Sequence, residues 1–381
     1  MKQTSRIIST YSADVFGVCS ALFELGGMTV MHDASGCNST YTTHDEPRWY
    51  DMNSMVYISA LSEMEAIMGD DEKLVGDIAA AAEALHPRFI AVAGTPIPAM
   101  TGFDFEAVAD LIEQRTGIPA FGFSTTGMHT YVQGASMALE AVARRFADRN
   151  VQKTEDITVN ILGLTPLDFS VNGADADIAQ FLEKAGYRVL SRWAMGSSLE
   201  EMAQAGAAHV NLVVSSTGLA AAKTLQEMFG TPYVVGVPIG TAFAEQLADA
   251  LEKAAKIGEN QFSVSDSPGG DILLIGESVT SVSLASAIEL ETGKAVRVLC
   301  TTEHGEGVLR AKDKMAIYEE EIAAEMGSVQ TVIADPLFRP ICPENVRFAE
   351  LPTEAFSGRI YREQIPNLVS GFDRFLSEVI K

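Results

Sequence analysis

The chain has 381 residues, with 27 Lys and Arg against 51 Asp and Glu, so its formal net charge is −24. This acidity argues against nucleic acid and anionic membrane surfaces as partners, because their phosphate groups would be repelled. No apolar run reaches the ~18 residues that a membrane span needs. Residues 1–16 contain no apolar signal core, so we expect a cytoplasmic protein.

One pattern recurs along the chain: an apolar β-branched run, a loop of small residues, an amphipathic helix, and a glycine before the next apolar run. Strands that are apolar throughout are typical of parallel sheets covered by helices. The glycine after each helix suits a left-handed helix cap. The pattern therefore predicts an α/β fold built from doubly wound units. Its copies occupy residues 89–123, 159–193, 209–237 and 271–300.

Two polar stretches, 146–157 and 256–271, divide the chain. They predict three Rossmann-like doubly wound domains with mainly parallel sheets, over residues 1–150, 157–262 and 270–381. Ligands of such folds bind beyond the carboxyl ends of the strands. The loops expected at these ends are 94–100, 163–169, 215–218, 276–279, 300–307 and 334–342.

Four cysteines, Cys19, Cys37, Cys300 and Cys342, are too few and too scattered for a disulfide scaffold of this size. Cys19 and Cys37 lie 18 residues apart, and small residues flank each of them. Iron–sulfur clusters usually take four thiolates, so a symmetric homodimer could complete a set with two from each subunit. The alternative is that both are small buried apolar residues.

Residues 32–37, His-Asp-Ala-Ser-Gly-Cys, are similar to the His-Gly-Pro-x-Gly-Cys segment of nitrogenase component 1 proteins. Residues 60–74 resemble the family's Glu-x-x-x-x-Gly-Gly-x-x-x-Leu block, with Asp70 in place of the second glycine. Residues 89–128 resemble its strand, Cys-Pro loop, helix and Gly-Phe turn, and residues 371–375 resemble its Gly-Phe-Asp-Gly-Phe segment. These similar segments follow one another in the same order as in the family, over nearly the whole chain.

The resemblance implies three Rossmann-like domains, dimers, and electrons from an ATP-dependent iron–sulfur reductase. The family includes nitrogenase, the light-independent protochlorophyllide reductase and the Ni-sirohydrochlorin a,c-diamide reductive cyclase. By position, Cys19 and Cys37 match the first two cysteines of the bridging cluster, whereas Thr95 stands where the third is expected. Four thiolates per dimer suit one 4Fe–4S cluster shared between subunits better than an eight-iron cluster, which needs six.

Two further positions depart from the nitrogenase pattern. The cysteine that anchors the nitrogenase cofactor would fall near Ser215, and the cofactor histidine near Ser370. A serine hydroxyl is a poor iron ligand beside thiolate or imidazole. The resemblance therefore predicts no iron–molybdenum cofactor and no reduction of dinitrogen.

Other residues allow two interpretations each. His129 and Gln133 lie where family members carry residues that face the substrate, and His129 could donate protons, or it could be a surface or capping group. His32 either hydrogen-bonds near the cluster or holds the turn. Cys300 and Cys342 either form a second metal site or proton-donating group, or close apolar strands.

The predicted function is that of an iron–sulfur oxidoreductase of nitrogenase component 1 type. No Gly-x-x-x-x-Gly-Lys-Ser/Thr motif occurs, so ATP would be hydrolysed on an iron-protein-like partner. The dimer partner would be a second copy or a paralogue, and the substrate a small molecule or a tetrapyrrole. The alternatives are a scaffold or carrier for metallocofactor assembly, and a binding protein that has lost its cluster.

Overall fold

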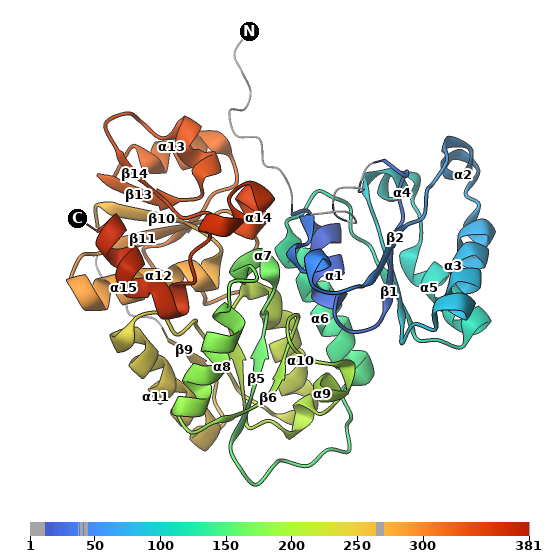
Figure 1. Cartoon of the computed structure of the whole chain (residues 1–381), viewed down its shortest axis with the longest axis horizontal. Helices are drawn as coiled ribbons and strands as arrows, with labels where there is room; N and C mark the ends of the chain where they lie inside the picture. The colour runs from blue at the N-terminus through green and yellow to red at the C-terminus, as the bar shows by residue number, and fades with distance from the viewer. Residues whose placement is uncertain (1–11, 37, 39–40, 42–44, 264–269, 381) are drawn as a thin grey trace.

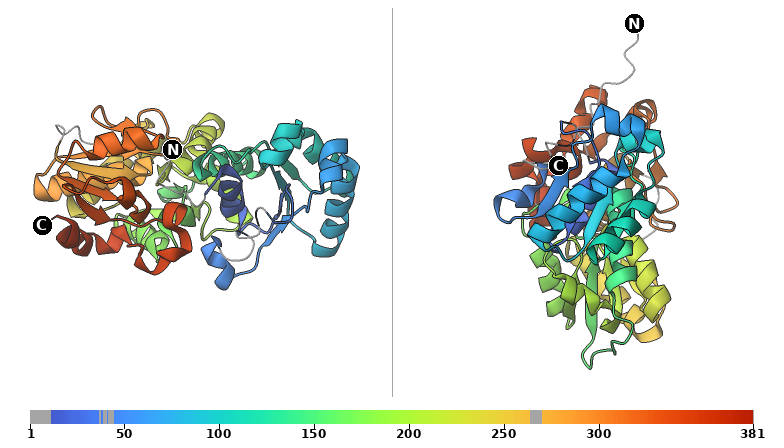
Figure 2. Two further views of the ribbon diagram at one scale, coloured as in Figure 1. Left: turned by 90° about the horizontal axis from the view of Figure 1, so that it is seen from above. Right: turned by 90° about the vertical axis from the view of Figure 1, so that its right-hand side faces the viewer.

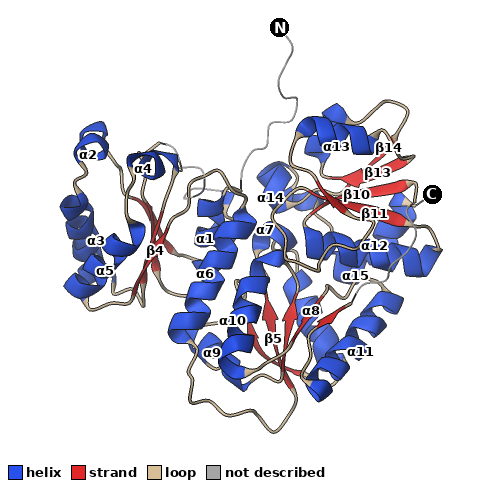
Figure 3. Cartoon of the chain, turned by 180° about the vertical axis from the view of Figure 1, so that it is seen from behind, coloured by secondary structure: helices blue, strands red, loops and turns tan. Residues whose placement is uncertain are grey.

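Three parallel sheets follow one another along the chain, each covered by helices (Figures 1 and 3). This arrangement confirms the predicted α/β class with parallel doubly wound sheets. The boundaries of the predicted domains remain a prediction. The computed structural model describes residues 12–36, 38, 41, 45–263 and 270–380. We refer to residues 12–146 as the first lobe, 158–262 as the second lobe and 272–379 as the third lobe.

The first lobe contains a four-stranded sheet in the order β2-β1-β3-β4. Its strands are β1 (Met28–Met31), β2 (Met55–Ile58), β3 (Ile90–Ala93) and β4 (Ala120–Phe123). Its helices are α1 (Asp14–Leu22), α2 (Glu63–Met68), α3 (Asp71–Leu85), α4 (Pro96–Thr101), α5 (Phe105–Thr116) and α6 (Tyr131–Phe146), with a 3₁₀ turn η2 (Pro47–Tyr50). Figures 1 and 3 show α1 and α6 between this sheet and the other two lobes.

The second lobe contains a five-stranded sheet in the order β6-β5-β7-β8-β9. Its strands are β5 (Thr158–Leu162), β6 (Arg188–Arg192), β7 (Val210–Val213), β8 (Tyr233–Val235) and β9 (Gln261–Phe262). Its helices are α7 (Pro166–Phe169), α8 (Ala174–Lys184), α9 (Leu199–Ala203), α10 (Leu219–Phe229) and α11 (Thr241–Ile257), with 3₁₀ turns η3 (Ala205–Ala207) and η4 (Ser216–Gly218).

The third lobe contains a five-stranded sheet in the order β12-β11-β10-β13-β14. Its strands are β10 (Ile272–Gly276), β11 (Val296–Cys300), β12 (Lys314–Met315), β13 (Thr331–Ala334) and β14 (Arg347–Glu350). Its helices are α12 (Ser278–Thr292), α13 (Glu319–Met326), α14 (Glu354–Ser357) and α15 (Leu368–Val379), with 3₁₀ turns η5 (Pro336–Ile341), η6 (Gly358–Ile360) and η7 (Arg362–Gln364). The last helix, α15, packs against α8 of the second lobe, so the two lobes share an apolar core.

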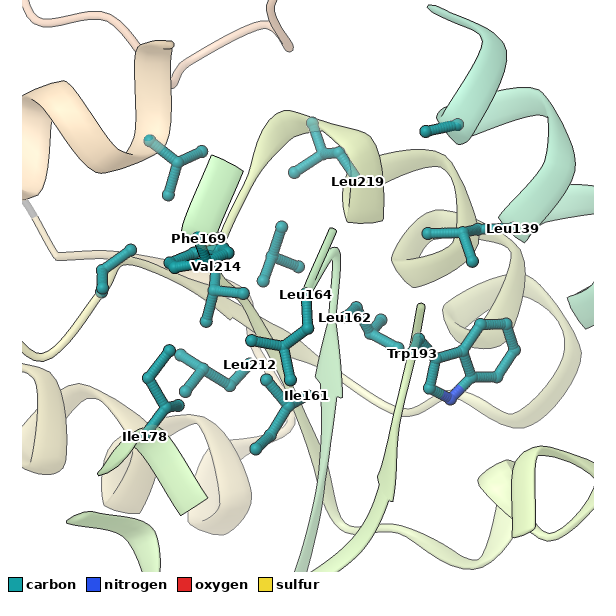
Figure 4. Close-up of a cluster of buried hydrophobic side chains, with 14 of the residues drawn as sticks. Leu139, Ile161, Leu162, Leu164, Phe169, Ile178, Trp193, Leu212, Val214 and Leu219 are labelled. Atoms are coloured by element: carbon teal, nitrogen blue, oxygen red, sulfur yellow. The ribbon is translucent and has the colours of Figure 1, made fainter. Parts of the chain in front are cut away.

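The central strands are buried along their whole length, as expected for apolar runs in a sheet covered on both faces. Every residue of β3, β5 and β7 is buried. Figure 4 shows the core of the second lobe, where Ile161 and Leu162 of β5 lie near Leu212 of β7 and the buried Trp193. Leu139 of α6 belongs to the same cluster, so a helix of the first lobe completes the core of the second.

Two glycines let α1 approach α6 closely. A Cβ atom at Gly17 would lie 2.0 Å from the carbonyl oxygen of Tyr131, and one at Gly134 would lie 1.8 Å from that of Asp14. No real Cβ makes contacts so short, so the helices could not pack in this way with alanine at either position. The close packing places Cys19 of α1 and Tyr131 of α6 beside the second lobe, as Figure 2 also shows for the two helices.

Candidate functional site

The three lobes meet where loops that follow strands of all three sheets come together. The first lobe contributes the loop between β4 and α6, and the second contributes the loops after β5 and β7. The third contributes the loops after β10 and β11. Ligands of parallel α/β sheets bind at this edge. The side chains that tie these loops together, which we call the three-lobe junction, are Tyr131, Asp168, Ser215, Glu277 and Glu303.

Asp168, in α7, is the centre of this junction. Its Oδ2 accepts hydrogen bonds from Ser215 Oγ at 2.6 Å and from Thr165 Oγ1 at 2.8 Å, and its Oδ1 accepts one from the hydroxyl of Tyr131. Desolvation and then the nearby charge of Glu277 raise the pKa of Asp168 to about 7, against the three hydroxyl donors, which lower it. Asp168 can therefore gain or lose a proton near neutral pH.

Glu277 is a second carboxylate at the junction, and it is buried. As the N-cap of α12 it accepts hydrogen bonds from the backbone N–H groups of Val279 at 3.1 Å and Thr280 at 2.9 Å. It also accepts from the N–H of Ser216 in the second lobe at 3.0 Å. The hydroxyl groups of Ser216 and Ser278 lie 2.6 Å apart and add a second contact between these lobes.

Glu303 joins the third lobe to the first. It accepts hydrogen bonds from the backbone N–H of Thr130, at 3.1 Å, and from its hydroxyl. The predicted catalytic residue His129 is half exposed, and its Nδ1 lies 3.4 Å from Glu303 Oε1. Gln133 is half buried in the first turn of α6. The structure thus brings His129 to the edge of the three-lobe junction.

The two serines at the expected cofactor positions lie in different surroundings. Ser215 is fully buried at the end of β7, and its hydroxyl donates to Asp168. Ser370 is exposed in the first turn of α15, where it lines a cavity of about 600 Å³ between α8, α11 and α15. Ser370 therefore does not share the hydrogen bonds that hold Ser215.

The two cysteines of the third lobe are also in different settings. Cys300 is fully buried at the end of β11, and its thiol donates to the carbonyl oxygen of Thr302 at 3.3 Å. Burial raises the pKa of Cys300 to about 12. Cys342 is half buried after η5, against the core beneath α13. Among the described residues, no group of three or more His, Cys, Asp or Glu side chains is placed to hold a metal ion.

Cys19 is fully buried in α1. Desolvation, followed by the negative charge of Glu46, raises the pKa of the Cys19 thiol well above its ordinary value. Cys37, its predicted partner, lies outside the described residues. Cys19 supplies a soft sulfur donor in a dry environment, which suits an iron–sulfur cluster, although the thiol must lose its proton to bind iron.

A buried ionic network lies beside Cys19. Arg48 donates to Glu46 from Nε at 2.7 Å and to Glu24 from Nη1 at 2.9 Å. The same Nη1 donates to the carbonyl oxygen of Ala194 in the second lobe at 2.8 Å. Both Arg48 and Glu46 are buried, so each neutralises a charge that would otherwise be costly in the interior. The network holds the chain near Cys19 against the second lobe.

His32 and Thr95 are joined at the ends of neighbouring strands. The Thr95 hydroxyl donates to the carbonyl oxygen of His32 at 2.9 Å, and His32 Nδ1 lies 2.9 Å from Ser59 Oγ. The His32 ring packs on Phe103, with ring centroids 4.5 Å apart. Burial lowers the pKa of His32 to about 4, so the ring is neutral at physiological pH. These contacts hold the turn that leads toward Cys37.

Sequence reasoning missed the carboxylates that organise the junction. Asp168 and Glu277 both lie in loops expected beyond strand ends, at 163–169 and 276–279. That position was the available signal, but it does not distinguish a ligand-facing carboxylate from a solvated one. The sequence around Arg48 does not indicate its role, because its partners Glu24 and Ala194 come from other parts of the chain.

Solved structures identify the fold class. A structure titled "Nitrogenase Cp1 at pH 6.5" superposes with a TM-score of 0.72, covering 100% of this chain and 94% of that chain at 17% identity. A second, "Nitrogenase Cp1 at pH 5", gives a TM-score of 0.69 at 16% identity. The three-lobed arrangement is therefore the fold of a nitrogenase component 1 subunit.

The chain belongs to the nitrogenase component 1 type oxidoreductase family, whose model matches residues 15–331. It is 26% identical over 326 residues to the nitrogenase iron-molybdenum cofactor biosynthesis protein NifE of Rippkaea orientalis, a match that covers 78% of this chain and 67% of that protein. It is 27% identical to NifE of Clostridium pasteurianum and 26% identical to the nitrogenase molybdenum-iron protein alpha chain of that organism, over 54% and 48% of this chain. These two matches span 43% and 34% of the relatives' own lengths.

Proposed function

We propose that this chain is a subunit of an iron–sulfur reductase in which Cys19 and Cys37 of two subunits hold one 4Fe–4S cluster. The partner would be a second copy or a paralogous chain. A reductase that resembles the nitrogenase iron protein would supply electrons at the expense of ATP. Membership of a family that binds iron–sulfur clusters supports this proposal. We propose a cytoplasmic location, and within the described residues no helix has the length and apolar character needed to cross a bilayer.

The cluster would accept and pass on single electrons when bound. This chain's own residues would exclude water from it, because Cys19 is fully buried in α1. Glu46 and Arg48 would hold the neighbouring backbone in place. His32, neutral and packed on Phe103, would support the turn before Cys37 without adding charge.

The observation that carries the proposal is the hydrogen bond from Ser215 to Asp168. At the position where the resemblance expects a thiolate ligand, the chain has a hydroxyl that is already engaged by a carboxylate. Hydroxyls bind iron poorly, so we propose neither an iron–molybdenum cofactor nor dinitrogen as substrate. The junction instead carries groups that hold protons, and a reduction consumes protons with electrons. The substrate would be a small molecule or a tetrapyrrole bound at the junction.

The similarity to NifE, a cofactor biosynthesis protein by its name, favours a second candidate function. In that case the chain would be a scaffold or carrier on which a metallocofactor is assembled. The two functions differ in turnover. A scaffold binds its cluster and releases it to an acceptor protein. In a reductase the cluster stays bound, passes its electrons to the substrate and is thereby reoxidised.

Anaerobic reconstitution tests the shared cluster first. Iron and sulfide analysis should give about half a 4Fe–4S cluster per chain, with a matching electron paramagnetic resonance signal after reduction. Cys19→Ser and Cys37→Ser should each abolish it, whereas the control Cys342→Ser should retain it. Less iron than this, or iron unchanged by Cys37→Ser, would contradict the proposal. Adding an iron-protein-like reductase, ATP and candidate tetrapyrroles then separates substrate-driven reoxidation from cluster transfer.

A further inference from the structure

We propose that the buried side chains of Glu24, Glu46 and Arg48 set a negative electrostatic potential at the Cys19 sulfur, which makes a cluster bound there harder to reduce. The consequence for a cluster rests on the proposed function. The potential at the sulfur does not, because it depends only on this chain's own side chains. These residues act on the site through space and touch neither substrate nor cluster.

Cys19 lies on the face of α1 that the ionic network covers. Phe16, Cys19 and Ser20 share one face of this helix, because residues three and four positions apart are neighbours on a helix surface. The Phe16 ring stacks on Tyr41 with ring centroids 5.1 Å apart. The Ser20 carbonyl oxygen accepts a hydrogen bond from Arg48 Nη2 at 2.7 Å. Cys19 therefore lies between two contacts that join α1 to the network.

The guanidinium of Arg48 is held in one place. Its Nε donates to Glu46 at 2.7 Å, and its Nη1 donates to Glu24 at 2.9 Å and to the Ala194 carbonyl at 2.8 Å. Its Nη2 donates to the Ser20 carbonyl and to Glu46 at 3.1 Å. All five N–H groups of the side chain thus have acceptors. Charges fixed in this way cannot reorient, so their field persists when the charge at the site changes.

The network carries more negative than positive charge. Two carboxylates, Glu24 and Glu46, face the single guanidinium of Arg48. The side chains of Glu46, Arg48 and Glu24 are 0%, 3% and 14% exposed, so solvent screens them little. The charge of Glu46 acts on the Cys19 thiol, in keeping with the shared helix face. The excess charge therefore makes the potential at this sulfur negative.

This excess charge has a direct consequence for electron transfer. Each electron delivered by the proposed reductase adds one negative charge at a cluster bound to Cys19. Nearby negative charge opposes that addition and lowers the reduction potential, which suits a centre that must reduce a substrate. At an effective dielectric constant of ~20, a unit charge ~8 Å away changes the ratio of reduced to oxidised cluster by roughly tenfold or more.

Two substitutions separate this electrostatic role from a purely structural one. Glu24→Gln and Arg48→Met break the same ion pair, but they remove charges of opposite sign. Loss of structure would move a measured property in the same direction in both variants, whereas loss of charge moves it in opposite directions. Glu24→Gln keeps an oxygen that can accept from Arg48 and from the N–H of Gly196, so we expect it to fold even if Arg48→Met does not.

A nitrile probe measures the field at Cys19 without iron. In the full-length chain with the other three cysteines replaced by alanine, Cys19 is converted to its thiocyanate, and the C≡N stretching frequency reports the local electric field. Glu24→Gln and Arg48→Met should shift this frequency in opposite directions. Shifts in the same direction, or a frequency that Glu24→Gln leaves unchanged, would overturn the proposal.

Potentiometric titration of the anaerobically reconstituted chain, followed by electron paramagnetic resonance, tests the consequence for the cluster. Glu24→Gln should move the reduction potential to a less negative value, and Arg48→Met should move it to a more negative one. Arg48→Lys keeps the charge and should stay close to the natural chain. A potential that is unchanged in Glu24→Gln would contradict the role at the cluster.

The third lobe offers a matched control pair. Arg310 and Glu289 also form a buried ion pair, 3.0 Å apart, with side chains 0% and 7% exposed. Glu289→Gln and Arg310→Met should change neither the nitrile frequency nor the reduction potential, and effects equal to those at Glu24 and Arg48 would contradict the proposal. A chain that binds no cluster would contradict the proposed function and leave the nitrile result standing. A bound cluster that does not respond to Glu24→Gln would contradict this inference alone.

Discussion

Ser215 donates a hydrogen bond of 2.6 Å to Asp168, and this contact joins the end of a central strand to the half-buried carboxyl at the meeting point of three lobes. Its removal has two measurable consequences. Ser215→Ala should raise the pKa of Asp168 further, because one donor to the ionised form is lost. The unfolding free energy should fall by about 1 kcal/mol. A carbon-13 titration of the Asp168 carboxyl and urea denaturation would measure the two effects, and a lowered pKa would contradict the first.

Arg48 should be among the most sensitive residues to truncation. Arg48→Met removes the partner of two carboxylates, Glu46 and Glu24, and the donor to the Ala194 carbonyl. We expect a loss of about 3–5 kcal/mol in the free energy of unfolding, because a buried charge is left unpaired. Arg374→Ala is the control, since Arg374 is 87% exposed and pairs only with the exposed Glu378 in the described contacts. It should cost less than about 0.5 kcal/mol by urea denaturation.

The close packing of α1 on α6 predicts opposite effects of the same substitution at two helical glycines. Gly17→Ala places a methyl group 2.0 Å from the Tyr131 carbonyl oxygen, so the helices must separate, at a cost of about 1–3 kcal/mol or more. Gly76→Ala in α3 meets no atom within 4 Å and should stabilise the chain by about 0.5–1 kcal/mol. Thermal and urea unfolding would compare the two. Equal effects would show that the helix contact is looser than described.

His32 should make the first lobe sensitive to acid. Burial lowers its pKa from 6.5 to about 4, so the folded chain binds fewer protons than the unfolded chain between these values. The stability linked to His32 is therefore present above pH 6.5 and is lost as pH falls toward 4, by on the order of 2 kcal/mol. His32→Gln should remove this loss while the natural chain retains it. Urea denaturation from pH 7 to pH 4.5, with an NMR titration of the His32 ring, would show the difference.

The fold could be predicted because its signal is local and repeated. Strands such as β3 and β5 are apolar at every position, and helices such as α5 and α10 end at Gly117 and Gly230 in the left-handed conformation. The candidate site could be predicted only in part. The loops that hold Asp168 and Glu277 were expected at strand ends, but the charge of Glu277 acts on Asp168 only after the sheets have folded.

The sequence alone determined the parallel α/β architecture, the family, and the residue types at the expected ligand positions, with Ser215 in place of a thiolate. These follow from short-range periodicity and from motifs that keep their order. The tertiary structure alone decided that Tyr131 donates to Asp168, that the charge of Glu277 acts on both, and that Arg48 reaches Ala194 across lobes. The reason is physical: desolvation and charge repulsion depend on which groups lie near each other in space, and residues far apart in the chain carry no sign of that in a single sequence.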